Sequence, residues 1–391
     1  MKVLFLTREY PPYSVGGVAK YVFWLSKSLA RLNVEVKVLS FGNPSDSNNE
    51  VTFFTPNSSL SANKVGVKDN LKICQDLRTI NRIADNFFVD GQFDVLHIAD
   101  PYLGPFIKSL NMVTTVHDTS VGELRFMLRN IRTVLDVKYS IFFSSLGPLL
   151  EHFTLKRSKA VVAVNDHIKN ELGRYYGISQ RRINVIVNGV SIPDVILKEE
   201  AKKKIGLNEN DLLIFSACRL IPRKRMDLLI KAVKILTENG MKNFSVIICG
   251  DGPQKHSLLN LVDEYGLSGK IKFTGWVPEE NLMLYYEAAD IFVLSSEYEG
   301  FPISLLEALA YEVAPVCSNI SPMILTERIN GLIFERGNFK QLAEKLRLML
   351  ENAELRMSIA EAGGELAKQF DWIKVALKTK KIYETLLYGY K

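Results

Sequence analysis

The chain has 391 residues, of which 47% are hydrophobic and 24% are charged, and its net charge is +6 at pH 7. This length leaves room for two domains, and the composition is typical of a soluble globular protein with a full core. No apolar run approaches ~20 residues, which argues against a membrane-spanning helix. The modest positive charge suits anionic partners, without discriminating among nucleotides, phosphates, acidic membranes and nucleic acid.

The cysteines and histidines predict neither disulfides nor a metal centre. The four cysteines, Cys74, Cys218, Cys249 and Cys317, are widely spaced, and three of them lie in apolar, strand-like runs. We therefore expect reduced thiols and a cytoplasmic location. The five histidines have no metal-ligand spacing. The first seven residues run directly into Arg8 and Glu9, so we expect no secretory signal.

Short apolar runs alternate with segments of helical period along the first half of the chain. The strands expected there are Val3–Thr7, Val34–Leu39, Val95–Ile98, Val113–Val116, Ala160–Val164 and Asn184–Val187. Helices are expected between several of these strands, for example at Ala19–Leu32 and Cys74–Phe87.

The second half repeats this alternation. Its expected strands are Leu212–Ala217, Ser245–Cys249, Lys270–Thr274, Ile291–Leu294, Ala314–Cys317 and Gly331–Phe334. Its expected helices are Met226–Glu238, Ser257–Tyr265, Asn281–Ala288 and Ser304–Tyr311.

Apolar strands separated by helices indicate parallel sheets that are covered on both faces. Twelve such strands are too many for one ordinary open sheet, so we predict an α/β protein with two doubly wound, Rossmann-like domains. The boundary is expected within Asn188–Leu197, just before the charged run Lys198–Lys204. This gives domains at 1–190 and 191–370. A last helix, about Trp372–Leu387 within 371–391, is expected to pack back on the first domain.

Two motifs follow strands of the first half. Gly16 and Gly17 precede a helix, where paired glycines let backbone amides approach a phosphate, although the pair alone is equally typical of a flexible loop. His117-Asp118 follows the strand Val113–Val116, at the end of a parallel strand where ligand contacts concentrate. We favour a functional role for His117 over a structural hydrogen bond with its neighbour.

A basic loop, Arg219-Leu-Ile-Pro-Arg-Lys224, follows the first strand of the second half. Cations at such a strand end can hold a diphosphate, Arg through its planar fork and Lys as a point charge. We take Arg219 and Lys224 as ligands and expect Arg223 and Arg225 to be solvated. The alternative is a loop that is solvated throughout.

Gly250-Asp-Gly-Pro253 follows the next strand and looks like half of a dinucleotide fingerprint. The third glycine of that fingerprint is replaced by Lys255, so the oxidoreductase version fails. The chain also contains no D-x-D, no phosphate loop of the G-x-x-x-x-G-K type and no nucleophile elbow.

Two carboxylates, Glu299 and Glu307, lie eight residues apart around a loop-to-helix switch. Gly300 permits a turn, and Pro302 suits the first position of a helix. The amides of Ile303, Ser304 and Leu305 would then lie at an open helix N-terminus that binds anions. A phosphate flanked by two hydroxyl-rich groups describes a nucleotide sugar. Alone, the spacing is equally compatible with a loop acid followed by an amphipathic helix.

Residues 121–159 carry seven basic residues against three acids, with the apolar stretch Ile141–Leu150 in the middle. Such a segment can dock onto an anionic membrane surface. It can also be a core helix with a solvated basic face, which is the interpretation that we favour.

The ordered set of these motifs resembles the retaining GT-B glycosyltransferases, in particular glycosyltransferase family 4. The resemblance spans almost the whole chain. It rests on Pro11-Pro12 with Gly16-Gly17, Val116-His-Asp118, Asn188-Gly-Val190, Arg219 with Lys224, Gly250-Asp-Gly-Pro253, Phe273-Thr-Gly275, Glu299 with Glu307-Ala-Leu-Ala, and Phe370-Asp-Trp372. No single motif is specific, but the order is.

The resemblance implies a role for each matching residue. Gly16 and Gly17, together with Gly250, would lie near the donor; His117 would contact the transferred sugar, and Arg219 and Lys224 would hold the diphosphate. Glu299 would bind sugar hydroxyls, Glu307 the ribose diol, and the backbone around Trp276 and Val277 the base. The helix start formed by Phe301, Pro302, Ile303, Ser304 and Leu305 would complete the donor site.

The implied activity is transfer of a sugar from a UDP- or GDP-sugar to a glycan or lipid-linked acceptor. The resemblance implies no essential metal or cofactor and no nucleic-acid partner. It also implies two domains facing across a cleft, with the acceptor entering from the N-terminal domain. We expect a cytoplasmic protein, with peripheral contact at the inner face of a membrane through 121–159 as an option. Alternatives are a nucleotide-sugar 2-epimerase of related fold and a non-catalytic partner subunit.

The chain departs from the family pattern at four positions. Cys218 and Arg225 stand where the family usually has glycine, and Glu312 stands where a glycine usually ends the helix after Glu307. Met323 replaces an expected glutamate. These departures put the identity of the donor in doubt more than the activity.

Overall fold

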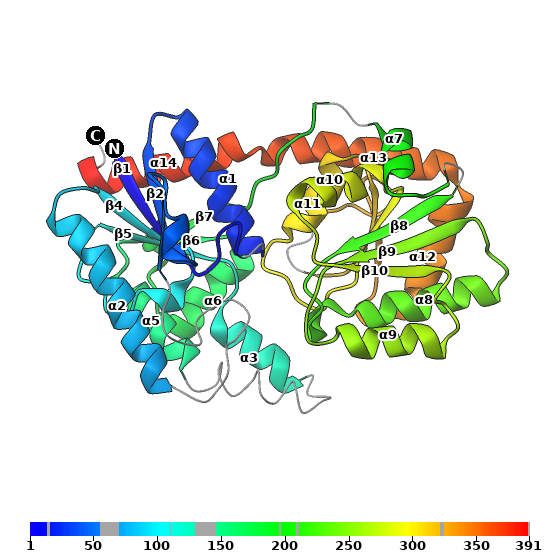
Figure 1. The fold of residues 1–391 in the computed structure, drawn as a ribbon, viewed down its shortest axis with the longest axis horizontal. Helices are drawn as coiled ribbons and strands as arrows, with labels where there is room; N and C mark the ends of the chain where they lie inside the picture. Colours follow the sequence, from blue (N-terminus) through cyan, green and yellow to red (C-terminus); the bar gives the residue numbers. More distant parts are fainter. Residues whose placement is uncertain are drawn as a thin grey trace. The chain divides into compact units, whose positions relative to one another are not determined.

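A computed structural model describes residues 1–13, 16–54, 70–109, 111–129, 146–194, 197–208, 211–320 and 324–389. The chain forms two compact units. One unit contains Met1–Gly189 together with Trp372–Lys391, and the other contains Val190–Asp371. Each unit is built around its own parallel sheet (Figure 1).

The sheet of the first unit has seven strands in the order β3-β2-β1-β4-β5-β6-β7, and each neighbouring pair is parallel. Its strands are β1 (Lys2–Leu6), β2 (Glu35–Phe41), β3 (Val51–Phe54), β4 (Val95–Ile98), β5 (Met112–Val116), β6 (Ala160–Ala163) and β7 (Ile183–Val185). The order reverses between β1 and β4, so this is a doubly wound sheet. The edge strand β3 was not predicted from the sequence.

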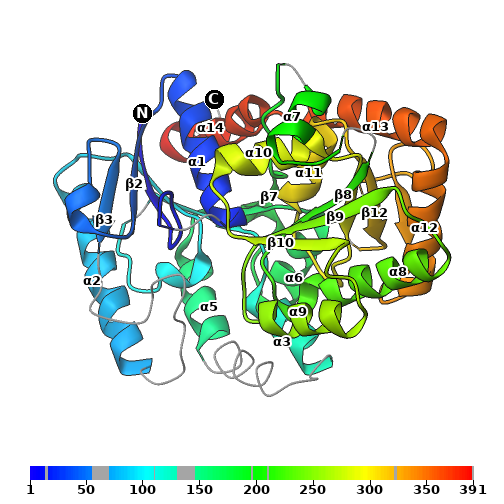
Figure 2. The same cartoon turned by 45° about the vertical axis from the view of Figure 1, so that its right-hand side comes forward.

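Helices cover both faces of this sheet. They are α1 (Gly17–Arg31), α2 (Asn70–Val89), α3 (Ser120–Arg129), α5 (Gly147–Arg157), α6 (Asp166–Tyr176) and α14 (Trp372–Tyr388). Alternate β1 residues, Leu4 and Leu6, pack with α2 and α5 in one apolar core. On the opposite face α14, the last helix of the chain, packs beside α1 (Figures 1 and 2). The prediction that the last helix returns to the first domain is therefore confirmed.

The sheet of the second unit has six parallel strands in the order β10-β9-β8-β11-β12-β13. Its strands are β8 (Leu212–Ala217), β9 (Phe244–Cys249), β10 (Ile271–Gly275), β11 (Ile291–Leu294), β12 (Ala314–Ser318) and β13 (Leu332–Phe334). The order reverses between β8 and β11. All six strands were predicted, with ends that differ by at most two residues.

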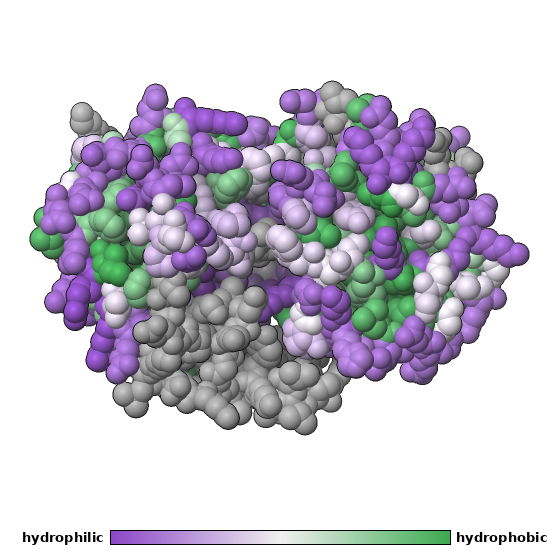
Figure 3. Space-filling model, in the orientation of Figure 1, coloured by the Kyte–Doolittle hydropathy of each residue, from purple (hydrophilic) through white to green (hydrophobic). Residues whose placement is uncertain are grey.

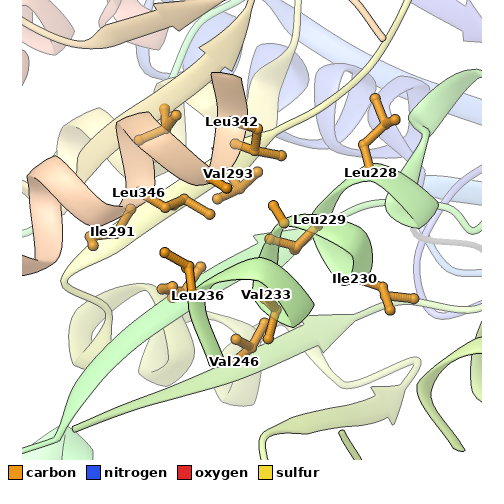
Figure 4. Close-up of a cluster of buried hydrophobic side chains, with 14 of the residues drawn as sticks. Leu228, Leu229, Ile230, Val233, Leu236, Val246, Ile291, Val293, Leu342 and Leu346 are labelled. Carbon is orange, nitrogen blue, oxygen red and sulfur yellow. The ribbon is translucent and has the colours of Figure 1, made fainter. Parts of the chain in front are cut away.

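Helices again cover both faces, and α8 and α12 share one core with the strands. The helices are α7 (Lys198–Lys204), α8 (Met226–Glu238), α9 (Lys255–Glu264), α10 (Glu279–Ala288), α11 (Ile303–Ala310), α12 (Phe339–Glu351) and α13 (Ala353–Ala367). Figure 4 shows Leu229, Leu236 and Leu346 pointing toward Val246 and Ile291 of the sheet. Burying about five such side chains contributes roughly 10 kcal/mol before the entropy cost of ordering the chain. This packed core fixes the positions of the strand ends in the second unit.

Candidate functional site

Most candidate residues follow the carboxyl ends of strands, and several of these strands (β1, β8 and β11) flank the points where strand order reverses. In the second unit, Arg219–Lys224 follows β8 and Glu299 follows β11, and these two strands are neighbours in the sheet. In the first unit, Gly16 follows β1 and His117 follows β5. Ligands of open α/β sheets bind at such reversal points. The two groups are described below, each within its own unit.

Lys224 and Glu299 form a buried ion pair in the second unit. Lys224 ends a short 3₁₀ turn, Pro222–Lys224, and its Nζ donates to Oε1 of Glu299. The Lys224 side chain is 12% exposed and that of Glu299 is 6% exposed. Charges this deeply buried are retained only when they are paired and hydrogen-bonded. The two residues that we predicted as ligands are therefore brought together.

Two further donors hold the Glu299 carboxylate. Arg223 donates to Oε2 at 3.2 Å, and the Ser296 hydroxyl donates to Oε1 at 2.5 Å. Burial alone would raise the pKa of Glu299, but the charges of Lys224 and then Arg223 outweigh burial and keep this pKa below its ordinary value. Glu299 is thus an anion at neutral pH. Its Oε1 already accepts from Lys224 and Ser296, whereas Oε2 accepts from Arg223 and retains a lone pair for a ligand hydroxyl.

The prediction that Arg223 and Arg225 are solvated is wrong. Arg223 also donates to the carbonyl of Tyr298 at 2.9 Å, which ties the basic loop to the Glu299 loop. Arg225 adopts a left-handed backbone with φ of 50°, and its guanidinium pairs with Glu297 and Asp227. Sequence spacing could not reveal the contacts with Tyr298 and Glu297, because these residues lie more than 70 positions further along the chain. Arg219, by contrast, is exposed and has no side-chain partner among the described residues.

Serines at the strand ends fix these loops, and the sequence analysis missed them. The Ser295 hydroxyl contacts the carbonyls of Lys224 at 2.9 Å and Arg225 at 3.0 Å. The Ser318 hydroxyl, at the end of β12, donates to the carbonyl of Ser296 at 2.5 Å. Three adjacent strands therefore brace the two candidate loops. The only signal in the sequence was the placement of small hydroxyl residues directly after apolar strands.

Helix α11 presents a shorter row of open amides than predicted. Pro302 is its N-cap rather than its first residue, and the Leu305 amide donates to the Pro302 carbonyl at 3.1 Å. Among the described residues, the amides of Ile303 and Ser304 have no acceptor. An open helix start of this kind attracts anions. The Phe301 side chain is buried against Phe370, so it serves the core and only its backbone faces the helix start.

Glu312 ends α11 without a glycine. The amide of Glu312 donates to the Leu309 carbonyl and that of Val313 to the Ala308 carbonyl, which completes a Schellman motif. Glu312 takes the left-handed position of this motif with φ of 51°. The replacement of glycine by Glu312 therefore does not remove the left-handed cap, which persists at a steric cost of about 1–2 kcal/mol.

Glu307 lies on the buried side of α11. The Glu307 side chain is buried, and Tyr286 of α10 lies close to it. Burial, and then the charge of Glu307, raise the pKa of the Tyr286 phenol well above its ordinary value. The predicted pair is thus split between two environments. Glu299 is bound by cations, and Glu307 faces a neutral phenol.

The glycines after β9 are required by packing. A β-carbon on Gly250 would lie 1.9 Å from the Cys218 carbonyl oxygen, and one on Gly252 would lie 2.4 Å from that of Leu220. Both residues also have positive φ values, 137° and 157°. The glycine loop therefore lies directly against the loop that carries Arg219. This gives Gly250 a supporting role in addition to the donor contact that we predicted.

Trp276 and Val277 follow β10. The Trp276 side chain is 54% exposed, whereas most large apolar side chains of this unit are buried. An exposed indole at a strand end offers a flat surface on which a ring can stack. Val277 is half-buried beside it.

In the first unit, the glycine pair lies against a charged cluster that the sequence analysis missed. A β-carbon on Gly16 would lie 2.2 Å from Oε2 of Glu9, whereas Gly17 has open space among the described residues. Glu9 pairs with Arg8 at 2.7 Å, and the Arg8 amide donates to Asp100 at 2.7 Å. A carboxylate thus already lies beside the start of α1. Arg8 and Glu9 follow β1, and Asp100 follows β4, so their positions just after strands could have indicated this cluster from the sequence.

His117 follows β5, and its ring packs edge-to-face against Tyr21 at 4.6 Å. Its Nε2 atom is buried and has no hydrogen-bond partner in the described part of the chain. Burial lowers the pKa of His117 to about 4, so the imidazole is neutral at pH 7. A neutral, unpaired ring nitrogen at a strand end can donate to or accept from a sugar hydroxyl.

Within the described ranges, no cluster of three His, Cys, Asp or Glu side chains could hold a metal ion. No described helix is long and apolar enough to cross a bilayer. On the face drawn in Figure 3, hydrophilic residues predominate and hydrophobic ones form smaller groups among them. Met323 and the first half of the apolar stretch, 141–145, lie outside the described residues.

The two halves of the chain match two family models. Residues 15–192 match the model "Glycosyltransferase Family 4", and residues 198–365 match "Glycosyl transferases group 1". A glycosyltransferase of Methanocaldococcus jannaschii is 24% identical over 98% of both chains. The Escherichia coli enzyme named UDP-Gal:alpha-D-GlcNAc-diphosphoundecaprenol alpha-1,3-galactosyltransferase is 26% identical, over 60% of this chain and 62% of its own.

Among solved structures, sucrose-phosphate synthase from Thermosynechococcus elongatus has the same fold. Its TM-score is 0.81 at 17% identity, and the match covers 100% of both chains. With two doubly wound units and a last helix that returns to the first, the protein is a glycosyltransferase of the GT-B class. It belongs to glycosyltransferase family 4, the glycosyl transferases group 1.

Proposed function

We propose that this glycosyltransferase is a retaining enzyme that moves a sugar from a UDP- or GDP-sugar to a glycan or lipid-linked acceptor. The observation that carries the proposal is the buried Lys224–Glu299 pair beside the open amides of α11. It combines fixed positive charge for a diphosphate with a fixed carboxylate for sugar hydroxyls. The printed name of the Escherichia coli relative, a UDP-galactose enzyme with a diphosphoundecaprenol-linked acceptor, supports this class of donor and acceptor.

Cleavage of the bond between sugar and diphosphate builds negative charge on the leaving group. Lys224 and the amides of Ile303 and Ser304 stabilise that charge, because they are oriented before the reaction begins, and Arg219 adds a further cation. Arg219 is exposed and so is free to swing onto the diphosphate, whereas Lys224 is fixed by Glu299. Each such contact contributes about 2–4 kcal/mol, by analogy with oxyanion-hole donors.

The two glutamates recognise different parts of the donor. Glu299 accepts hydrogen bonds from hydroxyls of the transferred sugar, and Glu307 accepts them from the ribose diol. The backbone around Trp276 and Val277 lies near the base, with Gly16, Gly17 and Gly250 close to the phosphates. His117, neutral at pH 7, contacts the sugar near the reacting carbon. The leaving phosphate assists deprotonation of the acceptor, so no separate protein base is required.

We propose that no metal ion is essential, because protein cations and amides supply the positive charge at the diphosphate. The test is thermal unfolding of the full chain with UDP, GDP, ADP and their sugar conjugates, in EDTA and then in magnesium. One base should raise Tm equally in both buffers. A ligand at ~100 times its dissociation constant adds about 2.7 kcal/mol of stability. Stabilisation that requires magnesium would overturn the metal-independent mechanism.

The donor identified in this way also tests the stereochemistry. Incubation with candidate acceptors, followed by NMR of the anomeric proton of the product, should show the anomeric configuration of the donor. An inverted configuration would refute retention. A sugar epimerised in the absence of any acceptor would indicate a nucleotide-sugar epimerase instead.

We also propose a cytoplasmic location, at the inner face of a membrane when the acceptor is lipid-linked. All four cysteines are free thiols, and α5 exposes Leu149 and Phe153 one turn apart. The two cations at the end of α5 are held by backbone carbonyls, Lys156 by that of Gly177 and Arg157 by those of Pro105 and Ile107, so the proposed contact rests on the apolar side chains. The full chain should sediment with anionic vesicles, and Leu149→Ser with Phe153→Ser should release it. Unchanged sedimentation of that variant would remove α5 from the contact.

A further inference from the structure

A chain of buried hydrogen bonds leads from the last helix of the protein to Tyr21, the residue that packs on His117. The Tyr383 hydroxyl on α14 contacts Nδ1 of His97 at 2.5 Å. Nε2 of His97 contacts the Thr115 hydroxyl at 2.7 Å, and Thr115 contacts the Tyr21 hydroxyl at 2.9 Å. All four side chains are at most 1% exposed.

The polar groups of this chain satisfy one another in an otherwise apolar layer. A neutral His97 donates through one ring nitrogen and accepts through the other, so the sequence of bonds closes in either direction. Burial, and then the nearby His117, lower the pKa of His97 to about 3, which keeps it neutral. A connected network of buried polar groups rigidifies its surroundings, because each broken bond would leave a desolvated group unpaired.

Tyr21 is the end of this network that faces His117. Its ring meets the His117 ring at 4.6 Å with an interplanar angle of 78°, and the ring of Trp372 in α14 packs against the same Tyr21 ring at 5.9 Å. This edge-to-face packing restricts the rotation of the imidazole. The contact with Tyr21 therefore holds the His117 ring, whose Nε2 has no hydrogen-bond partner among the described residues.

We infer that Tyr21 is a positioning residue for His117, and that α14 sets this position through Tyr383, His97 and Thr115. The inference rests on the role proposed above for His117. In this arrangement α14, the last helix of the chain, contributes to the reaction geometry of the first unit. A displacement of about 1 Å at such a group lowers turnover by up to 10²-fold.

The test uses the full chain with Tyr21→Leu, which removes the ring, and Tyr21→Phe, which removes only the hydroxyl. Tyr383→Phe breaks the network at its far end. Phe87→Leu is the matched control, because it trims an aromatic side chain of the same unit that packs on Phe93, just before β4 begins. The first measurement is the imidazole ¹H–¹⁵N spectrum, in which only five histidines appear and His117→Ala assigns the signal of interest.

Tyr21→Leu should shift the His117 ring signals by removing the neighbouring ring current, and Tyr383→Phe should shift them less. Phe87→Leu should leave them unchanged. Unchanged His117 signals in Tyr21→Leu would overturn the inference, whether or not His117 takes part in the reaction. This spectroscopic result is therefore separate from the fate of the proposed function.

The second measurement is kinetic. Tyr21→Leu should lower kcat by about 10-fold to 100-fold with little change in the donor KM. In a His117→Ala background, Tyr21→Leu should cause no further loss, because its effect passes through the missing ring. Multiplied losses in the double variant would overturn the inference and mark Tyr21 as an ordinary core residue. Wild-type turnover of His117→Ala itself would instead refute the proposed role of His117.

Discussion

The Glu299 carboxylate and the Lys224 ammonium are bonded to each other although they lie 75 residues apart in the chain. The contact joins the loop after β8 to the loop after β11, two strands that are hydrogen-bonded neighbours. Neither charge is placed near solvent, so each depends on the other. The pair therefore couples stability to the proposed chemistry.

Removal of either charge should reduce both transfer and stability. Lys224→Ala leaves Glu299 with Arg223 as its one cation and with the Ser296 hydroxyl, and Glu299→Ala leaves two cations without their anion. We expect transfer to fall by about 10²–10³-fold in each variant. Stability should fall by about 1–3 kcal/mol for Lys224→Ala and about 3–5 kcal/mol for Glu299→Ala. Steady-state kinetics and urea unfolding measure both quantities, and wild-type turnover in both variants would refute the assignment.

The Glu299 carboxyl should give the protein a specific acid dependence. Its pKa in the folded state lies below the ordinary value of 4.5. Its contribution to stability is therefore complete above 4.5 and is lost as pH falls through the folded pKa. The unfolding free energies of wild type and Glu299→Gln should differ by a constant amount above about pH 6 and converge below 4.5. A difference that stays constant through this range would show that Glu299 is not stabilised as an anion.

The two left-handed residues at positions 225 and 312 should respond oppositely to glycine. Glu312→Gly relieves steric strain at the end of α11 and should raise stability by about 0.5–1 kcal/mol. Arg225→Gly relieves the same strain but removes the ion pairs with Glu297 and Asp227. Stability should then fall by about 1–3 kcal/mol. Thermal unfolding of the two variants side by side distinguishes these outcomes, and equal gains would refute a structural role for the Arg225 guanidinium.

Gly250 should not tolerate alanine. The added β-carbon would lie 1.9 Å from the Cys218 carbonyl oxygen, and the backbone has a φ of 137°. We expect a loss of more than about 3 kcal/mol in unfolding free energy. Gly269→Ala is the control: it lies in the same unit, has nothing within 4 Å of the β-carbon position, and should change stability by less than about 0.5 kcal/mol. Similar values for the two variants would contradict the packing argument.

The alternation of apolar runs and helical segments was enough to predict the two sheets, because buried parallel strands are apolar on both faces. It missed β3, whose four residues Val51–Phe54 lie at a sheet edge and carry too little pattern. It also placed the candidate loops correctly, since strand ends follow from the strands. Apolar runs and helical periods therefore predict those elements whose own residues carry the pattern.

The electrostatic partners could not be predicted from sequence. Arg223 and Arg225 look like solvated loop residues until the loop after β11 is folded against them. Likewise, nothing local marks Tyr383 as a neighbour of His97, which precedes it by 286 residues. These contacts depend on tertiary packing. Glycine, in contrast, is not needed for the left-handed ends at Arg225 and Glu312, so its absence was a poor guide to backbone conformation.

The second unit begins and ends at neighbouring residues: the Val190 amide donates to the Phe370 carbonyl at 2.8 Å. The first unit, however, includes the last helix, so it is interrupted in the sequence by the whole of the second. A ribosome therefore releases every residue of the second unit before the first can bury Tyr21 and His97 under α14. The amino-terminal unit should be the last to mature during synthesis. A truncation that removes residues 372–391 should destabilise this unit and leave the second unit, Val190–Asp371, folded.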